Sequence, residues 1–162
     1  HCNLMKDLDG AAQRYELALA ENPSEPLAWL FSGTLHAFKG EGGPAVHAAE
    51  RALELSPLDP MRYFFESLTA TAALADGQYE RTIEHARRSL KLHRTHTSTL
   101  RAMAIAQVQL GRLEEARETV RALMVLEPHL TISGYLDRSP SSGFATGKLW
   151  SDSLAAAGVP AT

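Results

Sequence analysis

The residues best suited to bind an anion lie near the C-terminus, where segment 143–149 reads GFATGKL. A phosphate-binding loop needs four residues between its glycines and a Ser or Thr directly after its lysine, because its backbone N–H groups cradle phosphates and its hydroxyl binds Mg²⁺. This segment has three residues between its glycines, and Leu149 follows Lys148. The spacing argues against phosphate binding, and the Gly and Ser content predicts a surface loop.

Few side chains are suited to hold a metal ion or to act as a nucleophile. His93 and His96, in the segment HRTH, supply two of the roughly four ligands of a zinc site. The single cysteine, Cys2, has no partner for a disulfide or a C-x-x-C pair, which favours a reducing, cytoplasmic compartment. We predict no catalytic residues, no metal and no cofactor, and we expect the two histidines to lie in a solvated turn.

The charge balance disfavours anionic partners. The 162 residues carry 16 Lys and Arg against 19 Asp and Glu, a net charge of −3, so the chain has no strong field to attract nucleic acid or anionic lipid. No apolar run approaches the ~18 residues of a membrane span, and no signal segment is visible. We therefore predict a soluble domain that binds neither nucleic acid nor membrane.

The elements that position these residues follow an internal repeat. Segments 11–23, 45–57 and 116–128 each place small or apolar residues at the same offsets before a proline, and Pro23 and Pro57 are 34 residues apart. A fourth copy, 82–94, keeps the spacing but ends in arginine. Residues at i, i+4 and i+7 line one helical face. Each copy therefore predicts a helix, which the proline ends in three of the four.

A second helix is predicted before each of the last three copies, separated from it by a turn that contains glycine. The apolar stretches and the turns that follow them are 27–39 with 40–43, 61–75 with 76–77, and 97–110 with 111–112. The unit is a helix, a tight turn and an antiparallel helix. Pro57 and Arg94 are 37 residues apart, and we expect the three additional residues to lengthen helix 61–75.

This unit resembles the tetratricopeptide repeat (TPR), whose signature is a Trp, a Gly, an aromatic, Ala, an aromatic, Ala and Pro. The matching positions are Trp29, Gly33, His36, Ala45, Ala49, Ala52 and Pro57, of which His36 and Ala49 depart from the aromatic preference. The resemblance implies an all-α fold, a right-handed α-α superhelix of about three and a half repeats plus a C-terminal capping helix. Its units are a TPR array 1–128, divided into the partial repeat 1–23 and the repeats 26–57, 60–94 and 97–128, and a capping segment 129–162.

Both ends of such an array need covering, because a terminal repeat buries only one face on its neighbour. At the C-terminal end we expect Leu149, Trp150, Leu154 and Val159 to supply the inward face of the cap. At the N-terminal end, segment 1–6 is only a stub of a leading helix. We expect the rest to belong upstream in a longer protein, or a second copy to cover this face in a homodimer.

A narrower resemblance rests on the segments LSPLDPMRYFF, GQYERTIEHARRSLKLH and LGRLEEARETVRALMVLEPHLTISGYLDRSP and on the ending SLAAAGVP. Together they are similar to a bacterial subfamily in which such a block follows a class III adenylate/guanylate cyclase domain or a winged-helix transcription-regulator domain. This resemblance implies a fragment of a larger bacterial signalling protein whose chemistry lies upstream. The block would then sense, dock or dimerise.

The TPR resemblance assigns the inner surface of the superhelix to the leading helices, and places Trp29 and Tyr15 in the core. The partner-binding residues that it implies are Leu27, Leu30, Thr34, Phe38, Met61, Phe64, Arg101, Ile105 and Gln109. This lining is mainly apolar, which favours an apolar helix or extended segment as the partner. We predict a non-catalytic protein-interaction scaffold that binds a protein or peptide. The alternatives are a dimerisation module of an adenylate/guanylate cyclase, an enzyme within the array, and simple packing of repeat on repeat.

Overall fold

The computed structural model describes residues 7–162, and these form nine helices and no strand. The helices are α1 (Leu8–Glu21), α2 (Pro26–Lys39), α3 (Gly42–Leu55), α4 (Arg62–Ala75), α5 (Tyr79–Leu92), α6 (Thr97–Gln109), α7 (Leu113–Leu126), α8 (Ile132–Arg138) and α9 (Ala145–Ala156). Cys2 and the expected leading-helix stub 1–6 lie outside the described residues. The all-α prediction is confirmed.

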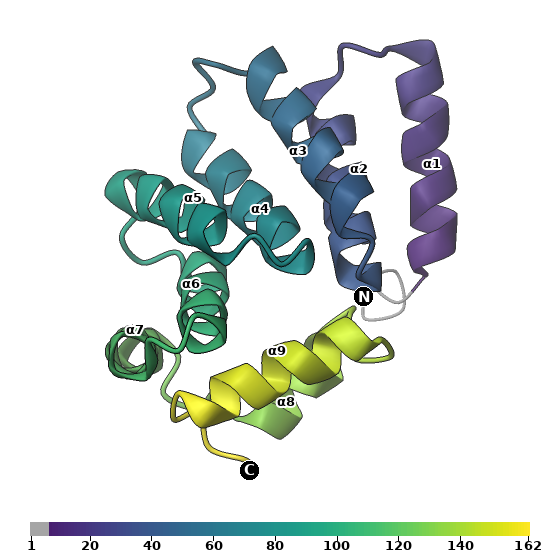
Figure 1. Ribbon diagram of the computed structural model, residues 1–162. Coiled ribbons are helices and arrows are strands. Elements are labelled where there is room, and N and C mark those ends of the chain that lie inside the picture. Colours follow the sequence, from purple (N-terminus) through teal and green to yellow (C-terminus); the bar gives the residue numbers. More distant parts are fainter. Residues whose placement is uncertain (1–6) are drawn as a thin grey trace.

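Six of the helices form three antiparallel pairs, α2 with α3, α4 with α5 and α6 with α7, and consecutive pairs stack side by side (Figure 1). The leading helix of each pair ends at a glycine with positive φ: Gly40, Gly77 or Gly111. Glycine adopts this conformation without the steric cost that a side chain adds. The predicted unit of helix, tight turn and antiparallel helix is therefore present three times in full.

Small residues let the two helices of a pair approach closely. Ala45, Ala49 and Ala52 of α3 are fully buried, and a Cβ added at Gly33 of α2 would lie 2.9 Å from the Ala45 carbonyl oxygen. The equivalent positions of α5 and α7 are buried as well: Thr82, Ala86, Ser89, Ala116, Val120 and Leu123. Such close packing gains dispersion contacts along the whole length of each pair.

The additional residues of the second full repeat lie in its connections, so the prediction of a longer helix is wrong. Helix α4 has 14 residues, as α3 and α5 do. The connection 56–61 before α4 is longer than the connection 22–25 before α2. Added loop residues cost little free energy, whereas a longer α4 would extend beyond α5. The turn after α2 is also shorter than the predicted 40–43, because α3 begins at Gly42.

A buried ionic group joins α4 to α5. The carboxylate of Glu66 lies 2.6 Å from His85 Nδ1 and accepts a hydrogen bond from Arg62 Nε at 3.2 Å, and Glu66 and His85 are both buried. Burial acts to raise the pKa of Glu66, but the hydrogen bond and charge of His85 and the charge of Arg62 hold that pKa below its ordinary value. The carboxylate therefore stays ionised at neutral pH and holds the pair together.

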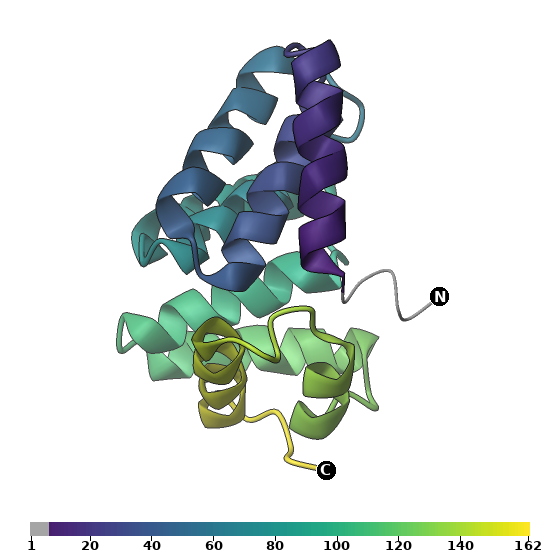
Figure 2. The ribbon, with the colours of Figure 1, turned by 90° about the vertical axis from the view of Figure 1, so that its right-hand side faces the viewer.

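The C-terminal segment, residues 129–162, packs across one side of the repeat array. Helix α9 packs against α6 and against the end of α2, with α8 beside it (Figure 1). In Figure 2, α1 to α3 and this segment lie at opposite ends of the molecule, with α6 between them. The backbone N–H of Ile132 donates to the Pro160 carbonyl at 2.8 Å, which fastens the C-terminal tail to the start of α8. The C-terminal segment thus caps the last repeat and also covers one side of the array.

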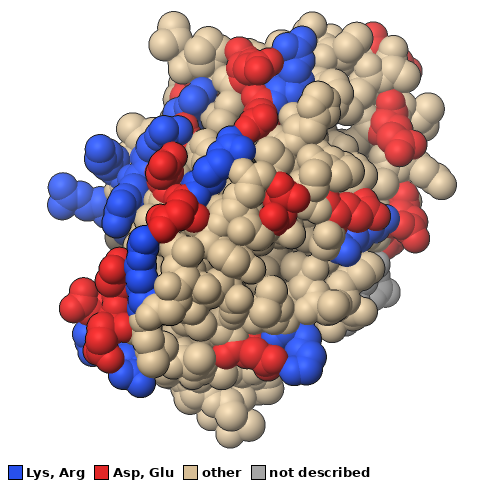
Figure 3. Space-filling view, viewed as in Figure 1, with Lys and Arg blue, Asp and Glu red and all other residues tan. Residues whose placement is uncertain are grey.

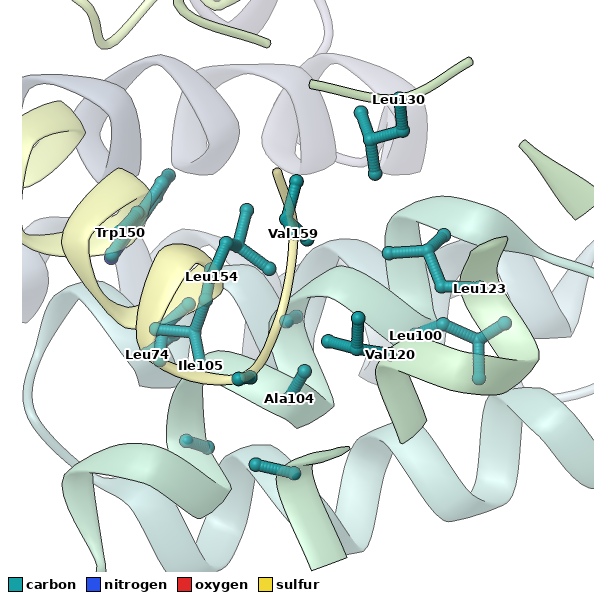
Figure 4. Close-up of a cluster of buried hydrophobic side chains, with 14 of the residues drawn as sticks. Leu74, Leu100, Ala104, Ile105, Val120, Leu123, Leu130, Trp150, Leu154 and Val159 are labelled. Atoms are coloured by element: carbon teal, nitrogen blue, oxygen red, sulfur yellow. The ribbon is translucent and has the colours of Figure 1, made fainter. Parts of the chain in front are cut away.

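The cap contributes to the largest hydrophobic cluster of the described residues (Figure 4). Trp150, Leu154 and Val159 are buried there, next to residues of α6 and α7. Leu149, which was expected to face inward with them, is 41% exposed. Leu149 precedes Trp150 by one position, and adjacent residues of a helix point about 100° apart. When Trp150 faces the core, Leu149 therefore points toward solvent.

Segment 143–149, predicted as a surface loop, is mostly helical. Helix α9 begins at Ala145, and Gly147 is buried within it. A Cβ at Gly147 would lie 2.1 Å from the Ser141 carbonyl oxygen. The glycine is therefore required for the close approach of α9 to the preceding connection, which gives Gly147 a structural role.

Two adjacent glycines of α3 provide a matched test of helix packing. A Cβ at Gly42 would lie 2.3 Å from the Asp76 Cα, whereas a Cβ at Gly43 meets no atom within 4 Å. We expect Gly42→Ala to lower the free energy of unfolding by about 1–3 kcal/mol. Gly43→Ala should leave it unchanged or raise it by up to about 1 kcal/mol, because alanine favours helix. Urea unfolding followed by circular dichroism measures both, and equal effects would contradict the proposed packing.

The buried Glu66 predicts a dependence of stability on pH. Because its pKa is lowered by folding, its contribution is fully present above the ordinary value of 4.5 and is lost as the pH falls through the lowered pKa. Glu66→Gln should cost about 2 kcal/mol at pH 7. It should also flatten the fall in stability below pH 4.5. Thermal melts of both proteins from pH 7 to pH 3 test this, and parallel curves would refute it.

Candidate functional site

A cavity remains between the leading helices and the C-terminal segment. We call this cavity, of about 360 Å³, the chamber. It is lined by residues of α2, α4, α6, α8 and α9 and by the connections on either side of α8. Its apolar walls come from Phe38, Leu68, Leu74, Leu130 and Trp150. A mostly apolar hollow of this size, with a few polar groups, has the form of a binding pocket.

Polar groups of the chamber gather around Arg101. Its guanidinium donates to both Glu127 oxygens at 2.9 and 3.0 Å and to Ser98 Oγ at 3.0 Å. Burial acts to raise the pKa of Glu127, but a hydrogen bond with Thr97 and the Arg101 charge and hydrogen bond hold that pKa below its ordinary value. Arg101 and Glu127 therefore form a charged pair, and the guanidinium of Arg138 leaves this side of the chamber net positive.

Two aromatic residues of the chamber carry N–H or O–H groups. Burial raises the pKa of the Tyr135 hydroxyl, so this group is a neutral phenol at pH 7. Trp150 meets Phe38 edge to face, with ring centroids 6.5 Å apart. Within residues 7–162 the indole N–H of Trp150 has no hydrogen-bond partner. An unpaired buried donor costs free energy, which an acceptor placed within its reach would offset.

The structure brings three of the predicted partner-binding residues together. Phe38, Arg101 and Ile105 all line the chamber. Leu30 and Thr34 are instead buried within the array. Because α4 packs along α2, it covers that side of the leading helix. Leu30 and Thr34 therefore stabilise the stack and are not available to a partner.

The other four predicted residues lie outside the chamber. Leu27 and Met61 are 45% and 48% exposed. Phe64 is half-buried in a row of aromatic rings. The side-chain amide of Gln109 donates to Ser153 Oγ at 2.9 Å, so this residue helps to hold α9 against α6.

The row of aromatic rings extends from α1 to the start of α6. Tyr15 stacks on Phe31 at 5.8 Å, Phe31 contacts Phe64 at 6.2 Å, and Phe64 contacts His96 at 6.4 Å. His93 lies 5.8 Å from His96. The histidines flank the turn between α5 and α6, as expected, but both are half-buried and not fully solvated. Burial and the nearby charge of His93 lower the pKa of His96, which is neutral at pH 7.

Three charged or phenolic side chains of the chamber were not identified from the sequence. Glu127 lies at the end of the last repeat, directly after α7, and Tyr135 and Arg138 lie in the C-terminal segment, where the repeat pattern assigns no inward face. Tyr135 and Arg138 reach the chamber because the C-terminal segment folds back toward α2, and no local pattern encodes this return. The only sequence signal was the run of polar residues between the two helices expected in segment 129–162. Such residues can line a cavity, which a simple cap would not require.

Within the part of the chain that the structure describes, no group of three or more His, Cys, Asp and Glu side chains is placed to hold a metal ion. The described helices are all too short or too polar to cross a membrane. Two His–carboxylate pairs occur among the described residues: Glu66 with His85 is shielded from solvent, and His36 with Glu41 is exposed.

Solved structures similar to this chain are repeat proteins. MamA superposes with a TM-score of 0.64 at 16% identity, covering 93% of this chain and 86% of MamA. The first TPR of RPAP3, bound to the HSP90 peptide SRMEEVD, gives 0.59 at 18%, with 74% and 94% covered. YrrB, described as a TPR protein with an unusual peptide-binding site, gives 0.59 at 18%, with 96% and 80% covered. At these identities the similarity shows the fold.

Sequence comparison supports the same conclusion. No curated protein matches the chain. One family model does, that of the anaphase-promoting complex, cyclosome, subunit 3, and it covers residues 42–123. The match spans half of the chain and includes the helices from α3 to most of α7. The chain therefore belongs to this family, and it has the tetratricopeptide-repeat fold that its sequence pattern predicts.

Proposed function

We propose that the chain is a non-catalytic scaffold that binds a short extended segment of a partner protein in the chamber. The observation that carries this proposal is the chamber itself, an apolar hollow with polar groups on one side, between three leading helices and the C-terminal segment. A side chain of the partner would lie between Phe38, Leu68 and Trp150. Its carbonyl or carboxylate oxygens would accept from Arg101, Arg138 or Tyr135.

The size of the chamber favours an extended segment over a helix. A helix with its side chains is about 10 Å across, and α9 already occupies the side of the array where a helix would lie. The volume of about 360 Å³ is sufficient for a few side chains. RPAP3 and YrrB, as their descriptions state, have peptide-binding sites, which supports this class of partner for the same fold.

Two narrower predictions, the cellular compartment and the neighbouring domains of a parent protein, rest on the sequence alone. A cytoplasmic location follows from the cysteine content. A role beside a bacterial adenylate/guanylate cyclase or winged-helix domain follows from the narrower resemblance, and none of the similar structures named above adds to it. We retain both as proposals, together with the exclusion of nucleic acid as a partner of this chain.

Filling the chamber tests the proposed function. Leu68 lines the chamber, whereas Leu149 is exposed on α9 and does not. Peptides selected from a random display library against the wild-type chain should bind Leu68→Trp at least about tenfold more weakly, because the larger ring takes the volume of the ligand side chain. The control Leu149→Trp should bind them unchanged. Isothermal titration calorimetry measures both, and equal affinity for all three proteins would refute the site.

A second candidate function, self-association, is favoured by the incomplete burial of one face of α1. Ala11, Tyr15 and Ala18 have the repeat offsets of the second helix, yet all three are only half-buried. Their equivalents in α3, α5 and α7 are buried against a leading helix. A second copy that covered this face would bury these residues in a homodimer.

Charge introduced on this face tests the homodimer. Ala18→Glu should lower the solution mass from dimer to monomer, because a dimer would place the carboxylate in an apolar interface. Gln13→Glu adds the same charge at an exposed position of α1 and should leave the mass unchanged. Light scattering over a tenfold concentration range measures the mass. A monomeric wild-type chain at all concentrations would exclude self-association.

A further inference from the structure

Four cations gather on the outer surface of α5, away from the chamber. Arg87, Arg88 and Lys91 lie in the second half of α5, Arg94 follows it, and all four are exposed. Figure 3 shows basic side chains concentrated on this side of the molecule. We call these four residues the basic patch.

The cations of the basic patch have no counter-ions within residues 7–162, where none of them forms an ion pair. Several other exposed cations are paired, such as Arg117 with Glu114 and Lys148 with Asp152. The charge of Arg88 acts on Glu66, but that carboxylate is buried and already bonded to Arg62. In a chain with excess negative charge, four neighbouring unpaired cations require an explanation.

The helix macrodipole explains only part of the patch. Lys91 lies in the last turn of α5, where a cation is stabilised by the partial negative charge of the helix end. Arg87 lies more than one turn before that end. It is four positions from Lys91, a spacing at which like charges destabilise a helix. The patch therefore costs the isolated chain stability.

The patch borders a shallow hollow between α5 and α6. The hollow measures about 430 Å³ and is lined by Arg87, Leu90, Lys91, Arg94, Met103 and Gln107. Leu90 and Met103 form an apolar floor, since both pack against the main hydrophobic cluster. The hollow thus combines a cationic rim with an apolar base.

A buried amide of the hollow lacks a partner for its donor. Gln107 is only 5% exposed, and its Oε1 accepts a hydrogen bond from Thr119 at 2.7 Å. No hydrogen bond joins its Nε2 to any described residue, and this atom is not among those fully shielded from solvent. The amide N–H groups can therefore donate into the hollow. Every polar group that faces a ligand here is a donor, so the ligand must supply acceptors.

We propose that the hollow and the basic patch bind an acidic segment of a protein, with its carboxylates on the arginine and lysine rim and an apolar side chain on the floor. This surface is separate from the chamber and does not depend on it. A protein segment suits it better than nucleic acid. Proteins that bind DNA strongly through its backbone can contact about 6–10 phosphates, more than the four cations of the patch could neutralise, and the net charge of −3 would repel a long polyanion.

A charge-matched set of variants tests this proposal. The probe is a short fluorescein-labelled peptide of alternating Glu and Leu, with fluorescence anisotropy as the readout. The triple variant Arg87→Gln, Lys91→Gln, Arg94→Gln should raise the Kd of this peptide at least about tenfold. Wild-type affinity should fall in high salt. The same peptide with Gln in place of Glu should bind at least about tenfold more weakly.

The control removes three cations elsewhere. Arg51→Gln, Arg117→Gln, Arg121→Gln changes the net charge equally at exposed positions outside the patch, and should leave the Kd unchanged. If the triple patch variant fails to fold by circular dichroism, Arg94→Gln alone, which lies outside the helices, should still weaken binding. Equal binding by patch and control variants would overturn the proposal. Tighter binding of an oligothymidine of equal charge would overturn it in favour of nucleic acid.

Discussion

The close approach of paired helices through small side chains is the constraint on which the other features depend. Gly33 has no side chain to hold α2 away from α3, and the buried positions of α3 that face it are alanines. The α2–α3 pair is therefore narrow, and larger side chains are excluded from the contact around Gly33. They lie instead where pairs meet one another and where the C-terminal segment meets the array, as Phe38, Trp150 and Leu154 do. The large side chains between the array and the C-terminal segment do not fill the volume between them completely, and the chamber is the volume that remains.

Helix α6 relates the two proposed binding surfaces. Arg101 and Ile105 line the chamber, whereas Met103 and Gln107 line the hollow beside α5. Residues two positions apart on a helix point about 200° apart, so the two sets project from opposite sides of one helix. An apolar partner segment on one side and an acidic segment on the other would be held about one helix diameter apart. Such an arrangement suits a scaffold, because it can bring two different partners close together without contact between them.

The array could be predicted from the sequence because its period is encoded locally. Offsets such as Ala45, Ala49 and Ala52 before Pro57 recur in each second helix, and the turn glycines mark where leading helices end. The site was only partly predictable. The phase of the repeat indicates which side of a leading helix faces inward, but it does not indicate which other helix packs over that side. Leu30 is covered by the next helix, while Phe38 lines the chamber and Ile105 lies buried in its wall. Tyr135 and Arg138 could not be placed, because their position depends on the path of a segment that has no repeat.

The bridge that α9 makes between α2 and α6 changes how the molecule should fold. In an open array each repeat contacts only its neighbours, so unfolding can begin at one end and proceed stepwise. Here the last helix contacts α2 of the first complete pair as well as α6, so repeats far apart in sequence share one interface. Releasing α9 would expose both ends at once, which couples distant repeats into a single cooperative unit. It also adds contacts between residues far apart in sequence, and such contacts slow folding. The contact of α9 with α2 therefore favours cooperative unfolding over the stepwise unfolding of a linear array.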